Sequence, residues 1–294
     1  MTVAPAESAY PVELQRRVDD YLEELRFEIG VGDDERLGEA MRYSLLAGGK
    51  RIRPVLALAT AEALGQEPDE VLPLAAALEM IHTYSLIHDD LPAMDDDELR
   101  RGQPTCHVAF GEDVAILAGD GLFAEALHLV LSKQEGEPAN VLAAAGELVA
   151  AAGVRGMVGG QYLDVAGAGP EHLRTLHELK TGALIAASVG CVLSLGGVHR
   201  PATMPFRRFA AELGVVFQIV DDILDVTGDE AELGKPRGSD ERHGKATYVS
   251  VYGLERAREL ARESHAKAKE ALAGAEANTM TLGQIADYIL TRSA

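Results

Sequence analysis

IHDDLPAMDDDELRRG, residues 87–102, places five aspartates and one glutamate within ten residues and ends on two arginines and a glycine. An acidic run of this kind is most often a solvated surface loop. Apolar residues recur through residues 81–91, however, and indicate a buried helix that leads into the aspartates. The acidic residues are therefore candidates for a site as well as for a surface.

A proline inside this stretch predicts how the aspartates are arranged. Pro92 disfavours helical geometry at Leu91, so we expect the helix to end just after Asp89 and Asp90. A short loop can then bring Asp95 back toward them. The rest of the acidic run, residues 96–98, is expected to be solvated or to support the first three aspartates.

The same helix carries a polar stripe upstream of the aspartates. His82, Ser85 and Asp89 follow one another at i, i+3 and i+7 on an otherwise apolar segment. A single histidine of this kind is more often a hydrogen-bonded core residue than a functional one. His82 nevertheless shares its helix face with an aspartate, which keeps it as a candidate site residue.

A second acidic cluster, FQIVDDILDVTGD at residues 217–229, has helical spacing. Gln218, Asp221, Asp222 and Asp225 lie within an arc of roughly 100° on one helix face. Three carboxylates one turn apart repel each other unless they are exposed or neutralised. A polar outer face is the alternative, but such faces usually mix in Lys, Arg and Glu. Oxygen ligands alone are best suited to Mg²⁺.

The composition bounds the fold and the class of protein. Apolar residues make up 47% of the 294 residues and recur at helical spacing, with almost no alternating β-branched runs. We expect an all-α chain forming one domain over residues 1–294, a multi-helix bundle of roughly ten helices. Its small-residue segments allow helices to pack closely around a core that can hold a metal site.

The net charge and the two cysteines limit the expected binding partners and the expected cellular compartment. A net charge of −20 disfavours nucleic-acid and anionic-membrane binding. Cys106 and Cys191 fit a reduced compartment and are expected to be core or pocket-wall residues. The start of the sequence lacks the pattern of a secretory signal, and the longest uncharged run, residues 183–198, is too short to span a membrane. We expect a cytoplasmic protein without stable membrane insertion.

Basic residues are scarce, yet several lie beside small residues that let a backbone approach an anion. LLAGGKRIRP, residues 45–54, concentrates Lys50, Arg51 and Arg53 after two glycines, which fits either a loop-to-helix junction or a phosphate site. The other bases in such settings are Arg100, Arg101, Lys180, Lys235 and Lys245. Two aspartate clusters and several basic spots together fit a diphosphate held by Mg²⁺ and by Arg and Lys. Nothing matches a P-loop.

In order and spacing, five motifs resemble those of the trans-isoprenyl diphosphate synthases, of the bacterial farnesyl or geranylgeranyl diphosphate synthase type. They are GGKRIRP (48–54), IHTYSLIHDDLPAMDDDELRRGQPT (81–105), KTGALI (180–185), GVVFQIVDDILDVTG (214–228) and GKPRGSDERHGKATY (234–248). The resemblance covers nearly the whole chain. It implies helices around a deep central cavity, a homodimer, and Mg²⁺-dependent condensation of isopentenyl diphosphate with an allylic diphosphate, with several ions and with Mn²⁺ as a possible substitute.

The resemblance also implies roles for individual residues. Asp89, Asp95 and Asp221 match the Mg²⁺ ligands, with Asp90, Asp222 and Asp225 in support. The positions that match the diphosphate site of isopentenyl diphosphate are Lys50, Arg53, His82 and Arg101. Those that match the allylic diphosphate site are Arg100, Lys180, Thr181, Gln218, Lys235 and Lys245, of which Lys180, Thr181 and Gln218 also belong to the catalytic set. The chain ends with one basic residue, Arg292, so we expect no role for the tail in closing the site.

Product length is expected to depend on Tyr84 and Ser85, the fifth and fourth residues before Asp89. On a helix they lie roughly 6 to 7.5 Å below the metal end, where a growing isoprenoid tail would descend. A tyrosine there can form the floor of the cavity, which favours farnesyl (C15) diphosphate as the product, with geranylgeranyl (C20) diphosphate as the alternative. Tyr84 could instead be an ordinary core tyrosine with no effect on product length. A terpene cyclase would be expected to carry more aromatics. A non-catalytic partner subunit would typically have lost a motif aspartate or lysine.

Overall fold

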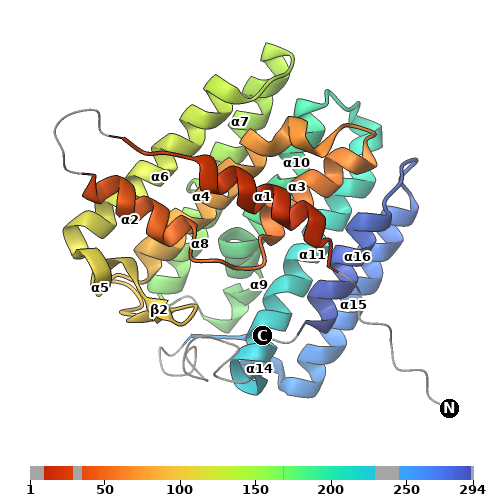
Figure 1. Cartoon of the computed structure of the whole chain (residues 1–294). Coiled ribbons are helices and arrows are strands. Elements are labelled where there is room, and N and C mark those ends of the chain that lie inside the picture. The colour runs from red at the N-terminus through yellow and green to blue at the C-terminus, as the bar shows by residue number, and fades with distance from the viewer. Residues whose placement is uncertain (1–9, 29–34, 168, 229–244, 293–294) are drawn as a thin grey trace.

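The computed structural model describes residues 10–28, 35–167, 169–228 and 245–292, and these form helices with a single two-residue hairpin (Figure 1). The expected all-α fold is confirmed. The α-helices are α1 (Val12–Glu24), α2 (Arg36–Leu45), α3 (Ile52–Ala63), α4 (Leu72–Asp89), α5 (Cys106–Phe110), α6 (Glu112–Lys133), α7 (Pro138–Ala152), α8 (Met157–Val165), α9 (Leu173–His177), α10 (Ala183–Leu195), α11 (Arg200–Thr227), α14 (Tyr248–Tyr252), α15 (Leu254–Ala273) and α16 (Met280–Thr291). Short 3₁₀ turns span Pro68–Val71 and Pro170–His172.

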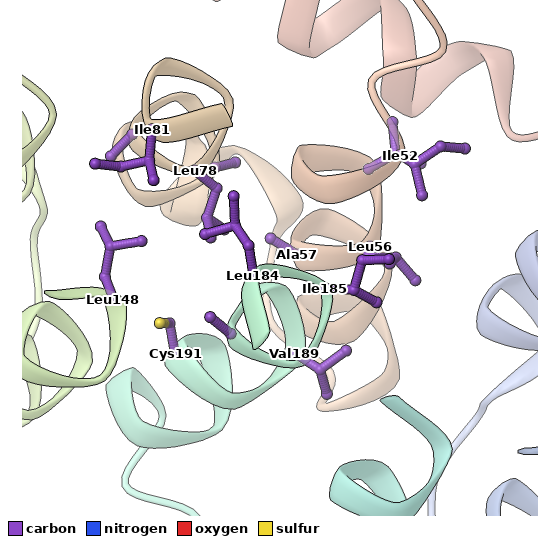
Figure 2. Packing of buried hydrophobic residues seen from close by; sticks show 14 of the residues in the cluster. Ile52, Leu56, Ala57, Leu78, Ile81, Leu148, Leu184, Ile185, Val189 and Cys191 are labelled. Carbon is purple, nitrogen blue, oxygen red and sulfur yellow. The ribbon is translucent and has the colours of Figure 1, made fainter. Parts of the chain in front are cut away.

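Helix α10 lies at the centre because its sequence is apolar all round. Such a helix has no face for solvent and must be covered on every side. It packs against α3, α4, α7 and α11. Figure 2 shows its contacts with three of them, through Leu184, Ile185, Val189 and Cys191 of α10, Ile52, Leu56 and Ala57 of α3, Leu78 and Ile81 of α4, and Leu148 of α7. The uncharged run at residues 183–198 thus forms a buried helix over Ala183–Leu195, and its last three residues lie beyond the helix end.

The central helix is continuous with the turn that carries Lys180 and Thr181 of the KTGALI motif. A π-helical turn, η3 (Glu178–Gly182), runs directly into α10. Single π turns of this kind often occur at functional sites. Since α10 is buried on all sides, its packing fixes the place of Lys180 and Thr181.

Two glycines allow other helices to approach this turn. A Cβ on Gly160 of α8 would lie 2.2 Å from the backbone nitrogen of Lys180. A Cβ on Gly214 of α11 would lie 2.9 Å from the Cα of Gly182. The backbones of α8 and α11 therefore reach η3 only because these positions lack side chains.

The hairpin is the one exception to the helical pattern in the described part of the chain. Strands β1 (Leu99–Arg100) and β2 (Gln103–Pro104) pair antiparallel, with Arg100 opposite Gln103. The two turn residues have positive φ, 54° at Arg101 and 74° at Gly102, as a tight two-residue hairpin turn requires. The two neighbouring arginines have different partners, since Arg100 pairs with Asp90 and Arg101 donates to the carbonyl of Gly48.

Three helical stretches are long and apolar enough to cross a membrane, judged by length and composition. They are Glu112–Lys133, Pro138–Val165 and Pro170–Leu195, and 39% to 56% of their most apolar windows is buried in this fold. Each of them contains charged residues, so a search for uncharged runs in the sequence does not reveal them. The absence of membrane insertion therefore stays a prediction.

We predict that Gly160→Ala destabilises the protein by about 1–3 kcal/mol, because the added methyl group would overlap the backbone of Lys180. Gly146→Ala is the matched control, since Gly146 is exposed in α7 and a Cβ there has nothing within 4 Å. The control should be neutral or more stable by up to about 1 kcal/mol, from helix propensity alone. Urea unfolding of both variants measures the difference. Equal stabilities would show that α8 does not depend on close contact with η3.

Candidate active site

A cavity of about 960 Å³ opens among α3, α4, α8, η3 and α11, with the hairpin on its rim. Nearly every residue proposed from the sequence as a site residue lines it. The described residues of that set on its wall are Lys50, Arg53, His82, Tyr84, Ser85, Asp89, Asp95, Arg100, Arg101, Lys180, Thr181, Gln218, Asp221, Asp222, Asp225 and Lys245. Lys235 lies outside the described residues.

The first aspartate cluster is arranged by the end of α4. The helix ends at Asp89, and the loop after Pro92 returns so that the backbone N–H of Asp95 donates to the carbonyl of Asp89 (2.9 Å). Asp89 and Asp95 both face the cavity. Burial raises the pKa of Asp89 to about 6, and the charge of Asp95 adds to the rise against the opposing effect of Lys180. A cation bound here would relieve that cost.

Asp90, predicted as a supporting metal residue, does not line the cavity. Its carboxylate is 4% exposed and is gripped by the guanidinium of Arg100, with Nε at 2.8 Å from both carboxylate oxygens. Asp90 follows Asp89 by about 100° around the helix end, and Arg100 holds its side chain away from the cavity wall. The structure thus gives Asp90 the task of orienting Arg100 toward the site.

The second cluster divides into an exposed aspartate and two buried ones. Asp221 is 58% exposed at its side chain, whereas Asp222 and Asp225 are buried. Asp222 accepts hydrogen bonds from Gln218 Nε2 (2.8 Å) and from the backbone N–H of Tyr248 (2.7 Å). The hydroxyl of Thr181 donates to Gln218 Oε1 (2.7 Å). Asp222 therefore fixes the amide of Gln218, whose oxygen faces Thr181.

The lysines on this wall are paired with carboxylates. Lys180 Nζ lies 2.5 Å from Asp164, and Lys245 Nζ lies 2.8 Å from Asp95 and 3.7 Å from Asp164. Asp164, on α8, is thus a shared partner of both lysines. Each ammonium group lies near the carboxylates that would bind a metal. The carboxylates on this wall can therefore bind the metal ion, and the lysines can bind the diphosphate that accompanies it.

A further group of residues on the cavity wall is basic. Arg53 is 7% exposed, and its Nε has no hydrogen-bond partner in the part of the chain that the structure describes. Burial lowers the pKa of Arg53 to about 10. Burial, reinforced by nearby arginines, lowers the pKa of His82 well below its usual value. Lys50 and Arg101 complete this group, and its positive charge suits an anion such as a phosphate.

The donor set fits Mg²⁺ in chemistry, although no three acidic, histidine or cysteine side chains form a ready-made metal group within the described ranges. Asp89, Asp95 and Asp221 offer carboxylate oxygens to one cavity. Magnesium commonly takes only one or two carboxylates and completes its shell with water and substrate phosphate. These residues therefore fit ions that arrive with a diphosphate.

Three residues of the cavity wall were missed by the sequence argument. Both side-chain polar atoms of Gln161 are buried without a hydrogen-bond partner among the described residues, and Asp164 lies one turn further along α8. Arg292 donates to Asp221 (3.1 Å), and its guanidinium lies 4.2 Å from the ring centre of Phe217. Arg292 therefore forms part of the cavity wall, while the expectation that the tail has no role in closing the site stays a prediction. The spacing from Gln161 to Asp164, at i and i+3, was the available signal.

Tyr84 forms a packed aromatic surface in the cavity. Its ring lies edge-on to Phe123 of α6 (5.4 Å) and to His88 (5.8 Å). Burial raises the pKa of Tyr84 to about 12, so the hydroxyl stays neutral. Ser85 lies beside it and donates from its hydroxyl to the carbonyl of His82 (2.8 Å).

Comparison with known proteins places the chain in a family. The polyprenyl synthetase family model matches residues 34–288. The farnesyl diphosphate synthase of Geobacillus stearothermophilus is 46% identical over 87% of this chain and 89% of its own length. The chloroplastic geranylgeranyl pyrophosphate synthase of Capsicum annuum is 48% identical over 86% of this chain and 71% of its own. The products in these two names differ while the identities are nearly equal.

A solved structure agrees in fold. The geranyltransferase of Helicobacter pylori, complexed with magnesium and isoprenyl diphosphate, superposes with a TM-score of 0.84 at 33% identity, over 99% of this chain and 98% of that one. The fold of this chain is thus the all-α isoprenyl synthase fold. With the motifs, the cavity and these relatives in agreement, the chain belongs to the polyprenyl synthetase family.

Proposed function

We propose that this protein is a Mg²⁺-dependent prenyltransferase that condenses isopentenyl diphosphate with dimethylallyl or geranyl diphosphate. The observation that carries the proposal is one cavity lined both by a group of bases and by carboxylates paired with lysines. The relatives named as farnesyl and geranylgeranyl synthases support the same reaction class. A cytoplasmic location is part of the proposal.

The two parts of the cavity would take different diphosphates. Lys50, Arg53, His82 and Arg101 would hold isopentenyl diphosphate without a metal. Arg100, Lys180 and Lys245 would face the allylic diphosphate beside Asp89, Asp95 and Asp221. Magnesium bound to these carboxylates would offset negative charge on the departing diphosphate. The lysines would do the same from the other side.

The reaction balances without a protein base. The allylic C–O bond breaks with its electron pair on diphosphate, and the double bond of isopentenyl diphosphate attacks the allylic cation. A proton then leaves the new cation for the released diphosphate. Thr181 and Gln218, already joined by a hydrogen bond, would present oxygen dipoles to the cation. The apolar side chains of Leu86, Val158 and Phe217 on the wall would exclude water.

Labelled isopentenyl diphosphate, each allylic diphosphate and Mg²⁺, followed by chromatography, tests the reaction. We expect a C15 diphosphate as the main product and none with EDTA. Cyclic hydrocarbons would indicate a terpene cyclase instead, and the absence of any product would indicate a non-catalytic subunit.

We predict that Asp89→Ala and Asp221→Ala each lower turnover by roughly 100-fold or more, since each removes a metal ligand that acts chiefly in the transition state. Thermal unfolding should change little, because Asp89 is costly to bury and the pair between Asp221 and Arg292 is largely exposed at the carboxylate. Asp20→Ala, at an exposed surface pair, is the control. Near-normal turnover of either variant at saturating Mg²⁺ would refute the metal assignment.

We propose C15 as the main product because the ring of Tyr84, braced by Phe123 and His88, forms a floor; C20 is the alternative. We predict that Tyr84→Ala shifts the product to C20 or longer. Tyr84→Phe is the matched control and should keep the wild-type product, because the ring stays. Chromatography of the products decides. A C20 product from the wild type, or loss of stability in Tyr84→Ala without longer products, would make Tyr84 a packing residue only.

We further propose a homodimer. Large apolar side chains are exposed on and beside α6 and α7, among them Leu131 (60%), Leu142 (67%) and Val154 (79%). Exposed apolar surface of this kind is typical of an interface. Light scattering should give twice the chain mass of 31.3 kDa. A mass of one chain at micromolar concentration would contradict the proposal.

A further inference from the structure

Arg51 lies between two proposed substrate-binding residues and lines the same cavity, but other protein groups occupy its guanidinium. Its backbone is left-handed (φ 50°, ψ 36°) at the start of α3, an uncommon conformation for a residue with a side chain. Its side chain is only 2% exposed. The sequence suggested a third phosphate-binding base in GGKRIRP, but the left-handed turn sends this side chain into the protein.

The guanidinium of Arg51 is held at all three nitrogens. Nε donates to Asp19 of α1 (2.9 Å), NH1 to Glu79 of α4 (2.8 Å) and NH2 to the carbonyl of Leu45 (2.9 Å). Glu79 is as buried as Arg51, at 2%. One residue thereby joins α1, α2, α3 and α4 at the base of the loop.

The rest of the loop is held by backbone contacts. The hydroxyl of Tyr10 donates to the carbonyl of Lys50 (2.5 Å), and the amide of Gln15 donates to the carbonyl of Gly49 (3.2 Å). Arg101 donates to the carbonyl of Gly48. These contacts fix the main chain before Arg51, and α3 begins directly after it, so the directions of Lys50 and Arg53 depend on this anchored turn.

Glu79 places negative charge in the basic part of the cavity. It lines the same cavity as Arg53 and Arg101, and both arginines feel its charge. A carboxylate near a phosphate site repels the phosphate. Glu79 therefore cannot help directly to bind an anion. We explain its presence by the hydrogen bond that it accepts from Arg51.

We propose that Arg51 and Glu79 are a positioning pair that fixes Lys50 and Arg53 in the geometry needed for the diphosphate of isopentenyl diphosphate. Asp19 of α1 supports this pair by accepting a hydrogen bond from Arg51. This inference rests on the proposed function, because it assigns these bases to that substrate. The pair acts through the loop and takes no part in the bond changes.

Because Glu79 is negatively charged, the competing explanations predict opposite changes in the affinity for isopentenyl diphosphate. If only charge mattered, Glu79→Gln would tighten binding of isopentenyl diphosphate, because a repelling carboxylate is removed. If Arg51 bound phosphate directly, freeing it from Glu79 would also tighten binding. Positioning predicts weaker binding instead. Arg51→Lys keeps the charge but loses the three-way contact, and should weaken binding as well.

We expect Arg51→Lys and Glu79→Gln to raise the KM for isopentenyl diphosphate roughly ten-fold, the size of a lost charged contact, with that for geranyl diphosphate changed less than about two-fold. Calorimetric titration with isopentenyl diphosphate in EDTA should show the same loss of affinity without turnover. Combining the two substitutions should give less than the product of their separate effects, because both break one contact. Lys50→Ala is the positive control.

Glu147→Gln is the matched control for loss of an ion pair, since Glu147 pairs with Arg207 (2.6 Å) away from the cavity. It should leave both KM values unchanged. If Arg51→Lys fails to fold, Asp19→Asn at the more exposed end of the network takes its place. Tighter or unchanged binding, or an equal rise in both KM values, would overturn the positioning pair while leaving the proposed function intact. A wild type that joins no substrates would instead overturn the function.

Discussion

The structure depends on how like charges are kept together in one cavity. Carboxylates from α4 and α11 face it beside two lysines, and a buried arginine, a neutral histidine and further bases face it elsewhere. Buried charges of one sign are costly unless partners offset them. Asp164 between Lys180 and Lys245, and Asp95 beside Lys245, supply such partners on one wall. The basic residues have fewer such partners, so a bound anion would stabilise that part of the cavity most.

The scaffold keeps these charges in place because helix ends and close helix contacts set their positions. The buried helix α10 fixes η3, Gly160 and Gly214 bring α8 and α11 against that turn, and the end of α4 delivers Asp89. A bundle with this packing transmits small changes to the cavity. The oxygen of Gln218 beside Thr181 likewise depends on Asp222 and the backbone of Tyr248.

Local spacing predicted most of the wall, and long-range contacts account for what it missed. The i, i+3, i+4, i+7 pattern brought Gln218, Asp221, Asp222 and Asp225 to one cavity, and Pro92 predicted the end of α4. Spacing could not show that Asp90 would be turned toward Arg100, because that depends on the hairpin. Nor could it pair Arg292 with Asp221, 71 residues away, or bring Asp164 to Lys245. Those contacts arise only when the helices pack.

The central claim is that the two diphosphates bind on different walls, one with a metal and one without. Calorimetric titration with isopentenyl diphosphate and with geranyl thiolodiphosphate, whose C–S bond resists ionisation, tests it directly when each is run in Mg²⁺ and in EDTA. The account predicts that isopentenyl diphosphate binds in both buffers, because its bases need no ion, and that the allylic analogue binds only with Mg²⁺. Equal binding of the analogue in EDTA, or a metal requirement for isopentenyl diphosphate, would contradict it.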